Sequence, residues 1–300
     1  MVEPIQFGFN EETFLSNSFQ QRPDESEVRE VQERALVEFT RFVEQLRSVG
    51  IQVIVHRDTS EYFTPDSIFP NNWISTHADG KLFTYPMAVP NRRNERKNRI
   101  IEALKSEFGY RHTDLSSWEN ETPARHLEGT GSMIFDRENN ICYAALSGRT
   151  HEAALIEFGQ MTAFDVVPFR ARGKNSEPIY HTNVMLSVGE TFVCIGLNTV
   201  IEKDRDRLIE QFEATGKTLI GFTNEQIYGD FAGNMLQVRN NRGERILIMS
   251  RRINDSLTDA QRSQLDKHND LLLTIDIPTI ESVGGGSVRC MMAEIFKPIK

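Results

Sequence analysis

The chain has 300 residues, of which 39% are hydrophobic and 26% are charged, a balance typical of a globular protein that buries a large core. Its formal net charge is −9 without a long basic run, so we expect neither nucleic acid nor an anionic membrane surface as a partner. The N-terminus lacks a basic segment and no apolar run approaches the roughly 18 residues of a membrane span, which predicts a soluble, cytoplasmic protein.

The first predicted helix runs from residue 25 to residue 49. Its apolar side chains recur at steps of three and four, which is the spacing of an amphipathic helix, at Val28, Val31, Ala35, Phe39, Phe42 and Leu46. Gly50 ends this helix, and the run Ile51 to Val55 is typical of a buried strand.

From residue 72 onward, one pattern recurs: a strand, a turn, a second strand, a helix and a further strand. In the first copy, strands are expected at 72–76 and 81–85 and a helix at 94–108. In the other three copies, each set of ranges gives two strands, a helix and a third strand: 132–135, 141–146, 151–158 and 164–167; 183–187, 192–195, 202–212 and 219–220; and 234–238, 246–249, 258–265 and 271–275.

A fifth copy opens at Ser287 to Cys290 and runs out of chain after its second strand. The N-terminal helix and the strand at 51–55 supply what it lacks. Successive copies are 60, 51, 51 and 53 residues apart, aligned on Trp73, Met133, Val184, Met235 and Val288. We therefore predict one domain over residues 1–300, a pseudo-symmetric five-unit α/β propeller whose ring is closed by the N-terminal helix and strand. The alternative is an ordinary mixed α/β sheet with accidental spacing.

The glycine run 284–286 leads directly into Cys290, the candidate nucleophile. Glycines allow another group to approach the backbone closely, although a small buried thiol after a tight turn is the alternative interpretation. The other two cysteines, Cys142 and Cys194, lie inside apolar strands and are interpreted as structural. Because no pair of cysteines has C-x-x-C spacing, we expect neither a disulfide framework nor a structural zinc site.

Three further side chains lie at or just before the first strands of other units, namely Asp66, Glu128 and His181. If the ring is correct, they converge with Cys290 on one central opening. Nucleophilic catalysis needs these residue types, because a thiolate attacks, a histidine moves protons and carboxylates hold a nitrogen-rich electrophile. A metal triad of His126, Glu128 and His181 is the alternative, but it lacks a zinc-enzyme spacing such as H-E-x-x-H, so we expect no metal.

Four motifs in this order resemble the guanidino-modifying, or pentein, superfamily, which includes arginine deiminases, dimethylarginine dimethylaminohydrolases and amidinotransferases. The resemblance covers essentially the whole chain and is greatest to bacterial citrulline hydrolases, which release ornithine, ammonia and carbon dioxide. The motifs are FTPD at 63–66, LEGTG at 127–131, YHTN at 180–183 and GGGSVRC at 284–290.

This resemblance implies a role for each matching residue. Cys290 would attack the central carbon of a guanidino or ureido group, and His181 would protonate the departing nitrogen and then activate water. Asp66 and Glu128 would hold substrate N–H groups or orient the histidine. Arg92 and Arg149 would bind the substrate α-carboxylate through paired hydrogen bonds, and Arg93 is the alternative to Arg92. Asn72 would line the opening together with Asn71 and Trp73.

One departure from the deiminase pattern bears on the substrate. Arginine deiminases and amidinotransferases have an aspartate two residues after the histidine, where this chain has Asn183. A neutral amide suits a neutral ureido group better than a guanidinium cation, which favours citrulline over arginine. We therefore expect a cofactor-free hydrolase of a small amino acid, with a homo-oligomer possible. Arginine deimination, amidino transfer and a non-catalytic binding protein on the same fold, such as a ribosome-binding factor, are the alternatives.

Overall fold

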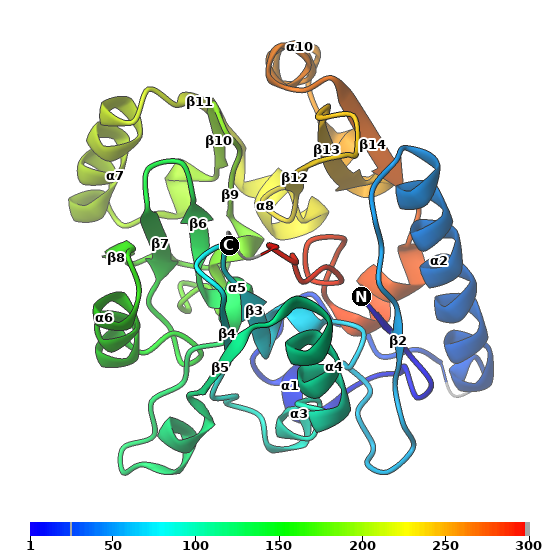
Figure 1. The fold of residues 1–300 in the computed structure, drawn as a ribbon. Coiled ribbons are helices and arrows are strands. Elements are labelled where there is room, and N and C mark those ends of the chain that lie inside the picture. Colours follow the sequence, from blue (N-terminus) through cyan, green and yellow to red (C-terminus); the bar gives the residue numbers. More distant parts are fainter. Residues whose placement is uncertain (25, 298–300) are drawn as a thin grey trace.

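The computed structural model describes residues 1–24 and 26–297. It contains four three-stranded sheets and one two-stranded sheet. The long helices lie at the edge of the molecule and the strands lie closer to its middle, with α2 (Val28–Ser48), α4 (Asn98–Phe108), α6 (Glu152–Met161), α7 (Glu202–Ala214) and α10 (Asp259–His268) around the outside (Figure 1). This is a mixed α/β fold, as expected.

Each three-stranded sheet is one of the predicted repeats. The second strand pairs antiparallel with the first and parallel with the third in all four sheets. The strands are β3 (Ile74–Thr76), β4 (Lys81–Thr84) and β5 (Arg111–Asp114); β6 (Ile134–Asp136), β7 (Ile141–Ala145) and β8 (Asp165–Phe169); β9 (Leu186–Val188), β10 (Phe192–Ile195) and β11 (Thr218–Gly221); and β12 (Leu236–Arg239), β13 (Arg245–Ser250) and β14 (Leu271–Ile275).

The middle strands are deeply buried. Every residue of β7 and of β10 is buried, which explains why their sequences are continuous apolar runs rather than alternating ones. Cys142 and Cys194 belong to these two strands and have no exposed surface. Burial raises the pKa of both thiols, so the structure supports the structural interpretation of these two cysteines.

The shorter helices connect these units and lie near the first strands. They are α1 (Glu11–Phe14), α3 (Pro90–Arg93), α5 (Gly129–Ser132), α8 (Asn224–Asp230) and α9 (Arg251–Ser256), together with short 3₁₀ helices at Pro70–Asn72, Ser116–Asn120, Thr182–Val184 and Leu197–Thr199. Within the described ranges, the chain has no helix that is both long and apolar enough to cross a membrane.

The fifth unit differs from the prediction. No strand forms over 287–296; a π-helical turn, Ile280–Gly284, leads instead into a tight turn in which the Cys290 N–H donates to the Ser287 carbonyl. The predicted strand at 51–55 is also wrong, because pairing begins only at β2 (His56–Arg57), which runs parallel to β1 (Val2–Glu3).

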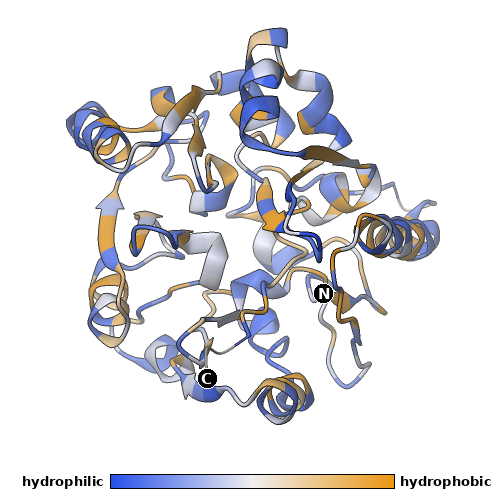
Figure 2. Cartoon of the chain, turned by 45° about the horizontal axis from the view of Figure 1, so that its top comes forward, coloured by the Kyte–Doolittle hydropathy of each residue, from blue (hydrophilic) through white to orange (hydrophobic). Residues whose placement is uncertain are grey.

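The N-terminal helix nevertheless covers the C-terminal segment. It begins at Val28 rather than at residue 25, which lies outside the described residues. Its hydrophobic face, visible as orange alternating with blue in Figure 2, packs against the C-terminal segment in one cluster that includes Phe39, Phe42, Ile280 and Met291. Its Glu38 carboxylate accepts the Thr279 and Ile280 N–H groups at 2.9 and 3.0 Å.

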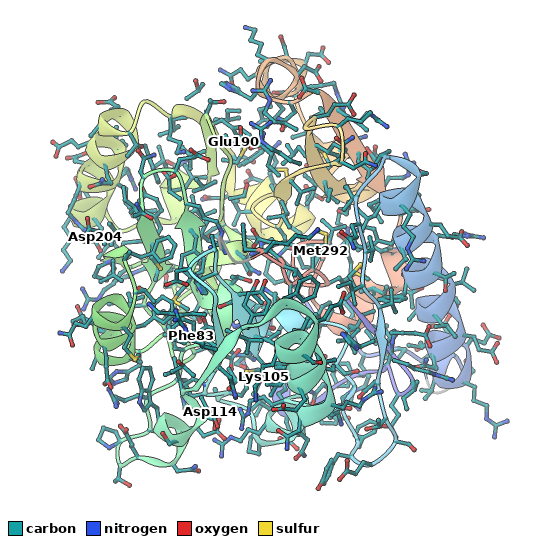
Figure 3. The ribbon with its side chains drawn as sticks, viewed as in Figure 1. Phe83, Lys105, Asp114, Glu190, Asp204 and Met292 are labelled. Atoms are coloured by element: carbon teal, nitrogen blue, oxygen red, sulfur yellow. The ribbon has the colours of Figure 1, made fainter. Side chains whose placement is uncertain are left out.

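This contact holds the nucleophile segment in the interior. Figure 3 shows Met292 near the middle of the molecule, whereas Asp204 on α7 lies at the edge. The side chain of Phe42 is fully buried, and replacing such a phenylalanine with alanine typically costs about 3–5 kcal/mol. The position of Cys290 therefore depends on packing between the two ends of the chain.

Candidate active site

His181 and Glu128 form the centre of the candidate site. Glu128 directly precedes α5 in the second unit, and His181 directly precedes the 3₁₀ helix Thr182–Val184 in the third. Their side chains meet where the two units adjoin, with His181 Nε2 2.7 Å from Glu128 Oε2. Both residues are buried, so the contact is shielded from solvent.

The electrostatics of this pair favour a neutral imidazole beside an ionised carboxylate. Burial alone would raise the pKa of Glu128, but the Arg149 guanidinium and the hydrogen bond from His181 together lower it well below its usual range. Burial lowers the pKa of His181 to about 4, although Glu128 opposes this shift. The imidazole therefore donates from Nε2 at neutral pH, and its Nδ1 is available as a base.

Cys290 receives two amide hydrogen bonds. Its Sγ lies 3.3 Å from Asn183 Nδ2 and 3.1 Å from Asn234 Nδ2. The Asn234 Oδ1 atom in turn accepts the Arg289 N–H at 3.0 Å, which fixes the orientation of that amide. Two N–H donors aimed at one sulfur atom stabilise a thiolate more than a thiol.

Asn234 is a site residue that the sequence analysis missed. It directly precedes Met235 in the fourth unit, just as Asn72 precedes Trp73 and Asn183 precedes Val184. All three asparagines are buried. The repeat alignment therefore contained a signal, since the same residue type occupies the same register in three units.

Asp66 lies under the N-terminal segment. Its Oδ2 accepts from Asn10 Nδ2 at 2.7 Å and from Thr13 Oγ1 at 3.3 Å, and Arg92 Nε is 3.8 Å away. Its Oδ1 is buried and has no partner within the described residues. Burial raises the pKa of Asp66, although Arg92 and the hydrogen bond from Asn10 partly oppose this shift. A buried acceptor without a partner indicates a place for a ligand donor.

Arg92 is engaged within the protein rather than open to a ligand. Its Nε and Nη2 atoms donate to the two oxygens of Glu95, each at 2.9 Å, and Nη1 donates to Asn72 Oδ1 at 2.9 Å. Only 3% of this residue is exposed. The bidentate pair with Glu95 takes up the edge of the guanidinium that was expected to bind the α-carboxylate. Arg92 instead orients Asn72, whose Nδ2 is left buried without a partner among the described residues.

The Arg149 guanidinium makes fewer close contacts within the protein than that of Arg92 does. Its Nη1 lies 3.4 Å from Glu128 Oε2, its Nη2 donates to Ser16 Oγ at 2.6 Å, and the guanidinium carbon is 5.1 Å from the centre of the Tyr180 ring. Its Nε is buried and has no partner in the part of the chain that the structure describes. The sequence analysis did not identify Ser16 or the N-terminal segment 10–20, because that segment has no periodic pattern.

Glycines allow adjacent units to approach closely at this site. A Cβ on Gly129, whose φ is +47°, would lie 2.2 Å from the Asn71 carbonyl oxygen. A Cβ on Gly131 would lie 2.3 Å from Asn72 Nδ2 and 2.9 Å from His181 Nδ1. Asn72 and His181 therefore face the same small space, which any other residue at position 131 would fill.

Six predicted side chains thus form two connected groups, one of Asp66, Arg92 and Asn72 and the other of Glu128, His181 and Arg149. Cys290 and Asn183 contact each other, and no hydrogen bond joins the thiol to His181 within the described residues. No set of three or more His, Cys, Asp or Glu side chains in residues 1–24 and 26–297 is arranged to hold a metal ion. The chemistry available is that of a thiol, an imidazole and buried carboxylates.

Comparison with solved structures shows which folds this chain resembles. The N-terminal domain of ArgZ, an arginine dihydrolase of the ornithine-ammonia cycle in cyanobacteria, matches with a TM-score of 0.74 and 16% identity over 100% of this chain and 98% of that domain. A variant of AgrE bound to L-arginine matches with a TM-score of 0.76 and 17% identity, again over 100% of this chain. A dimethylarginine dimethylaminohydrolase adduct gives 0.62 at 15% identity over 87% of this chain and 90% of that one.

The chain spans only 40% of the longer ArgZ and AgrE chains. No curated protein matches it. A family model described as N,N dimethylarginine dimethylhydrolase, eukaryotic, matches residues 3–297. The chain therefore belongs to that family, within the guanidino-modifying pentein superfamily that its four motifs resemble.

Proposed function

We propose that this protein is a cysteine-dependent hydrolase of non-peptide C–N bonds that converts citrulline to ornithine, ammonia and carbon dioxide. The observation that carries the proposal is a set of buried polar atoms without partners in the described structure, on Asp66, Asn72, Asn183 and Arg149. Native proteins rarely leave such atoms unpaired, so their gathering around one thiol and one imidazole is best explained by a polar substrate.

The chemistry of these atoms favours a neutral substrate. Asp66 Oδ1 and Asn183 Oδ1 are acceptors, whereas Asn72 Nδ2 is a donor because its own oxygen is taken by Arg92. A ureido group offers both N–H donors and a carbonyl acceptor, but a guanidinium offers donors only. A site that presents both kinds of atom therefore matches the ureido group of citrulline better.

The ion pairs within the site also favour a neutral substrate. Three carboxylates are buried at this site, and each has a protein guanidinium within 4 Å: Arg92 at 3.8 Å from Asp66 and 2.9 Å from Glu95, and Arg149 at 3.4 Å from Glu128. The protein's own cations thus already balance much of the negative charge. A cationic substrate would gain less from these carboxylates than it would from free ones.

In the first half of the reaction, the Cys290 thiol proton passes to His181, and the imidazolium that forms is stabilised by Glu128 at 2.7 Å. The thiolate, held by the amides of Asn183 and Asn234, attacks the ureido carbon. One C–N bond then breaks, and His181 returns the proton to the departing nitrogen. The product is an amine and a covalent S-carbamoyl intermediate.

In the second half, a water molecule replaces the departed amine. His181 accepts a proton from the water, whose oxygen attacks the carbamoyl carbon, and the Cys290 sulfur leaves as a thiolate. The overall reaction consumes one water, because the carbamic acid released decomposes to ammonia and carbon dioxide. For the substrate α-carboxylate we propose Arg149, whose Nε has no partner among the described residues.

Arginine is the second candidate. ArgZ is an arginine dihydrolase and AgrE binds arginine, and the free Oδ1 of Asp66 suits a guanidinium N–H as well as a ureido one. The two are separated by comparing kcat/KM for citrulline and arginine, with mass spectrometry of the products. We expect citrulline to be preferred and ornithine to be formed; a clear preference for arginine would overturn the citrulline assignment.

A second experiment tests whether the protein is an enzyme at all. Ammonia release from citrulline should be abolished in Cys290→Ser, because a serine hydroxyl lacks the nucleophilicity of a thiolate here. Cys194→Ala removes a buried thiol far from the motifs and should retain kcat despite some loss of stability. Activity of Cys290→Ser equal to that of wild type would instead favour a binding protein on this fold.

The proposed function requires that the units meet around a common centre. We propose that the four sheets and the β1–β2 pair form a closed five-unit propeller in one domain over residues 1–300. Support comes from the side chains that bridge different units, such as the contact of Asn234 with Cys290 and that of Glu128 with His181.

A further inference from the structure

A large cavity in the described structure is separate from the polar side chains of the candidate active site. Its volume is about 600 Å³, within the range of small-molecule sites, and Cys290 does not line it. The segments that line it include 134–138, 187–190 and 235–239, which contain β6, the end of β9 and β12. The catalytic side chains precede these same strands, and the cavity extends along the strands to their far ends at Asp136, Val188 and Arg239.

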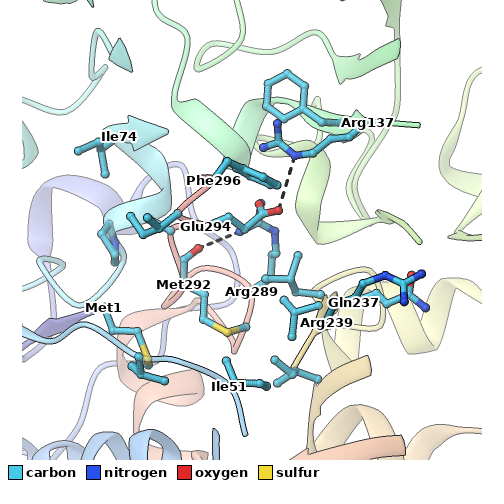
Figure 4. Close-up of a pocket in the computed structure, with 18 of the residues that line it drawn as sticks. Met1, Ile51, Ile74, Arg137, Gln237, Arg239, Arg289, Met292, Glu294 and Phe296 are labelled. Atoms are coloured by element: carbon cyan, nitrogen blue, oxygen red, sulfur yellow. Dashed lines mark hydrogen bonds and ion pairs between the residues drawn. The ribbon is translucent and has the colours of Figure 1, made fainter. Parts of the chain in front are cut away.

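Most of the cavity wall is apolar. It includes the side chains of Ile51, Trp73, Ile74, Met235 and Val238. Ile51 and Ile74 are labelled among the side chains drawn around this cavity in Figure 4. A space of this size with such walls suits an apolar body, because moving that body out of water gains roughly 25 cal/mol for each Å² buried.

One part of the cavity wall places two guanidinium groups beside one carboxylate, while Asp136, Glu138 and Glu190 line other parts of it together with Arg239 and Lys297. The Glu294 carboxylate is shared by two guanidinium groups, Arg289 at 2.9 Å and Arg137 at 3.7 Å. Arg289 also donates to the Met292 carbonyl at 2.9 Å, so it is fully engaged, whereas the Arg137 guanidinium makes no hydrogen bond within the described residues. These three groups together carry a net charge of about one positive unit.

Arg137 is held in place by aromatic rings instead. Its guanidinium carbon lies 3.9 Å from the centre of the Phe296 ring and 4.9 Å from that of Phe135, and Figure 4 shows it beside Phe296 with its contact to Glu294 dashed. Burial lowers the pKa of Arg137, and the like charge of Arg289 adds to this effect. Such a cation would be stabilised by an additional anion.

We propose that this cavity binds an amphipathic carboxylate, with its anionic head on Arg137 and its apolar chain along the wall formed by Trp73, Ile74 and Val238. The head would complete the hydrogen bonding of the guanidinium, which pairs with a carboxylate through two parallel bonds. An uncharged lipid would leave Arg137 without this partner, and a cationic amphiphile would be repelled by it. The site is independent of the reaction at Cys290.

Trp73 offers a direct reporter of occupancy. The chain has two tryptophans, and Trp118 does not line the cavity. In a Trp118→Phe background, ω-bromododecanoate should therefore quench Trp73 fluorescence through its bromine atom. We expect saturable quenching below the micelle-forming concentration, with the same result in a Cys290→Ser variant that cannot turn over substrate.

Variants of Arg137 and a ligand without a carboxylate test whether binding depends on the charge of Arg137. Arg137→Gln should weaken binding of ω-bromododecanoate about tenfold or more, the loss of one charge-assisted hydrogen bond, and Arg137→Lys should retain part of the affinity. ω-Bromododecanol should bind wild type more weakly and should not distinguish these variants. Arg29→Gln on the exposed face of α2 is the matched control and should bind as wild type does.

Three outcomes would overturn the proposal. The first is quenching that does not saturate, and the second is equal affinity of wild type for the acid and the alcohol. The third is competition by citrulline, which would place the fatty chain in the active site instead. Thermal unfolding of each variant shows whether a lost signal reflects a lost fold, and Arg137→Lys keeps the test valid if Arg137→Gln does not fold.

Discussion

The two ends of the first strands have opposite chemistry. The residues that precede these strands are polar and densely hydrogen-bonded, as the contacts of Glu128, His181 and Asn234 show. The residues toward the other ends, such as Val188 and Val238, line a largely apolar cavity of about 600 Å³. One set of strands therefore supports a tightly specified polar site at one end and a loosely filled apolar space at the other.

This difference predicts how well each end of the strands tolerates amino-acid substitutions. At the polar end, removing one partner leaves a buried donor or acceptor unpaired, which costs about 1–3 kcal/mol or more where a charge is involved. At the apolar end, the wall borders a cavity, so a slightly larger apolar side chain has room to bury more apolar surface. Matched substitutions at the two ends should therefore have different effects.

The largest effect is expected at Glu128. Glu128→Gln removes the charge that stabilises the His181 imidazolium, so kcat should fall by roughly 10³–10⁴-fold, as expected for the orienting acid of a catalytic triad. The measurement is steady-state ammonia release with citrulline.

Glu119→Gln is the control for that change. Glu119 is also a buried carboxylate with an arginine partner, Arg96 at 2.7 Å, but it lies outside the site. We expect this variant to lose stability and to keep its kcat. Equal losses of kcat in both variants would mean that buried charge, rather than position at the site, is what matters.

A smaller effect is expected for the asparagines at either end of β12. Asn234→Ala removes one of the two amides on Cys290 Sγ and should slow both turnover and iodoacetamide alkylation of Cys290 by about 10–100-fold, with little change in KM. Asn240, just beyond the other end of β12, contacts the Val49 carbonyl, so Asn240→Ala should affect stability and leave alkylation unchanged.

The pH dependence of stability compares two buried histidines. Burial lowers the pKa of His181, just before β9, to about 4 and that of His77, just after β3, to about 3, from an ordinary value of 6.5. Below pH 6.5 the unfolded chain binds protons that the folded chain does not. Each group should therefore lower the free energy of unfolding by up to about 1.4 kcal/mol per pH unit as the pH falls toward 4, and contribute no such loss above pH 7.

The pH dependence of the free energy of unfolding is measured by urea denaturation of wild type, His77→Gln and His181→Gln at several pH values. Each variant should show a shallower loss of stability between pH 6.5 and 4 than wild type. Only His181→Gln should also lose activity at pH 8. Parallel curves for wild type and His77→Gln would contradict the neutral, buried state of His77.

The smallest effect is expected in the cavity. Val238→Leu adds one methylene group to the wall and should stabilise the fold by up to about 0.8 kcal/mol. Val193 lies in β10 and is fully buried among packed neighbours, so Val193→Leu should destabilise it by about 1–3 kcal/mol. Destabilisation of the same size in both variants, measured by urea denaturation, would show that the cavity wall is as tightly packed as the core.

Four of the five units could be predicted in outline because most of their strands are apolar runs bounded by turn residues, although β5, which has no apolar residue, was not predicted. The fifth could not, since the apolar stretch after Cys290 resembles a strand but is held by tertiary contacts. Asn234 takes the Arg289 N–H, and the Arg289 side chain binds Glu294 and the Met292 carbonyl. Local sequence does not reveal partners that lie 55 residues away.

The candidate site residues His181, Glu128, Asp66 and Cys290 were proposed from their positions at or just before the first strands of different units. A recurring residue type in one register, as at Asn72 and Asn183, extends the same alignment to Asn234. The pairing of Arg92 with Glu95 was not predicted, although Glu95 lies three residues later and this spacing favours an ion pair on a helical turn. The N-terminal segment that binds Asp66 carries no repeat, so only the folded chain shows it.

Gly131 has a practical consequence for structural work. A single methyl group there would enter the space that Asn72 Nδ2 and His181 Nδ1 share, without altering any functional group. Gly131→Ala would therefore act as a steric block that displaces the imidazole while leaving the thiol intact. Crystals of such a variant grown with substrate would offer a route to trapping the bound molecule before reaction, complementary to replacing the nucleophile.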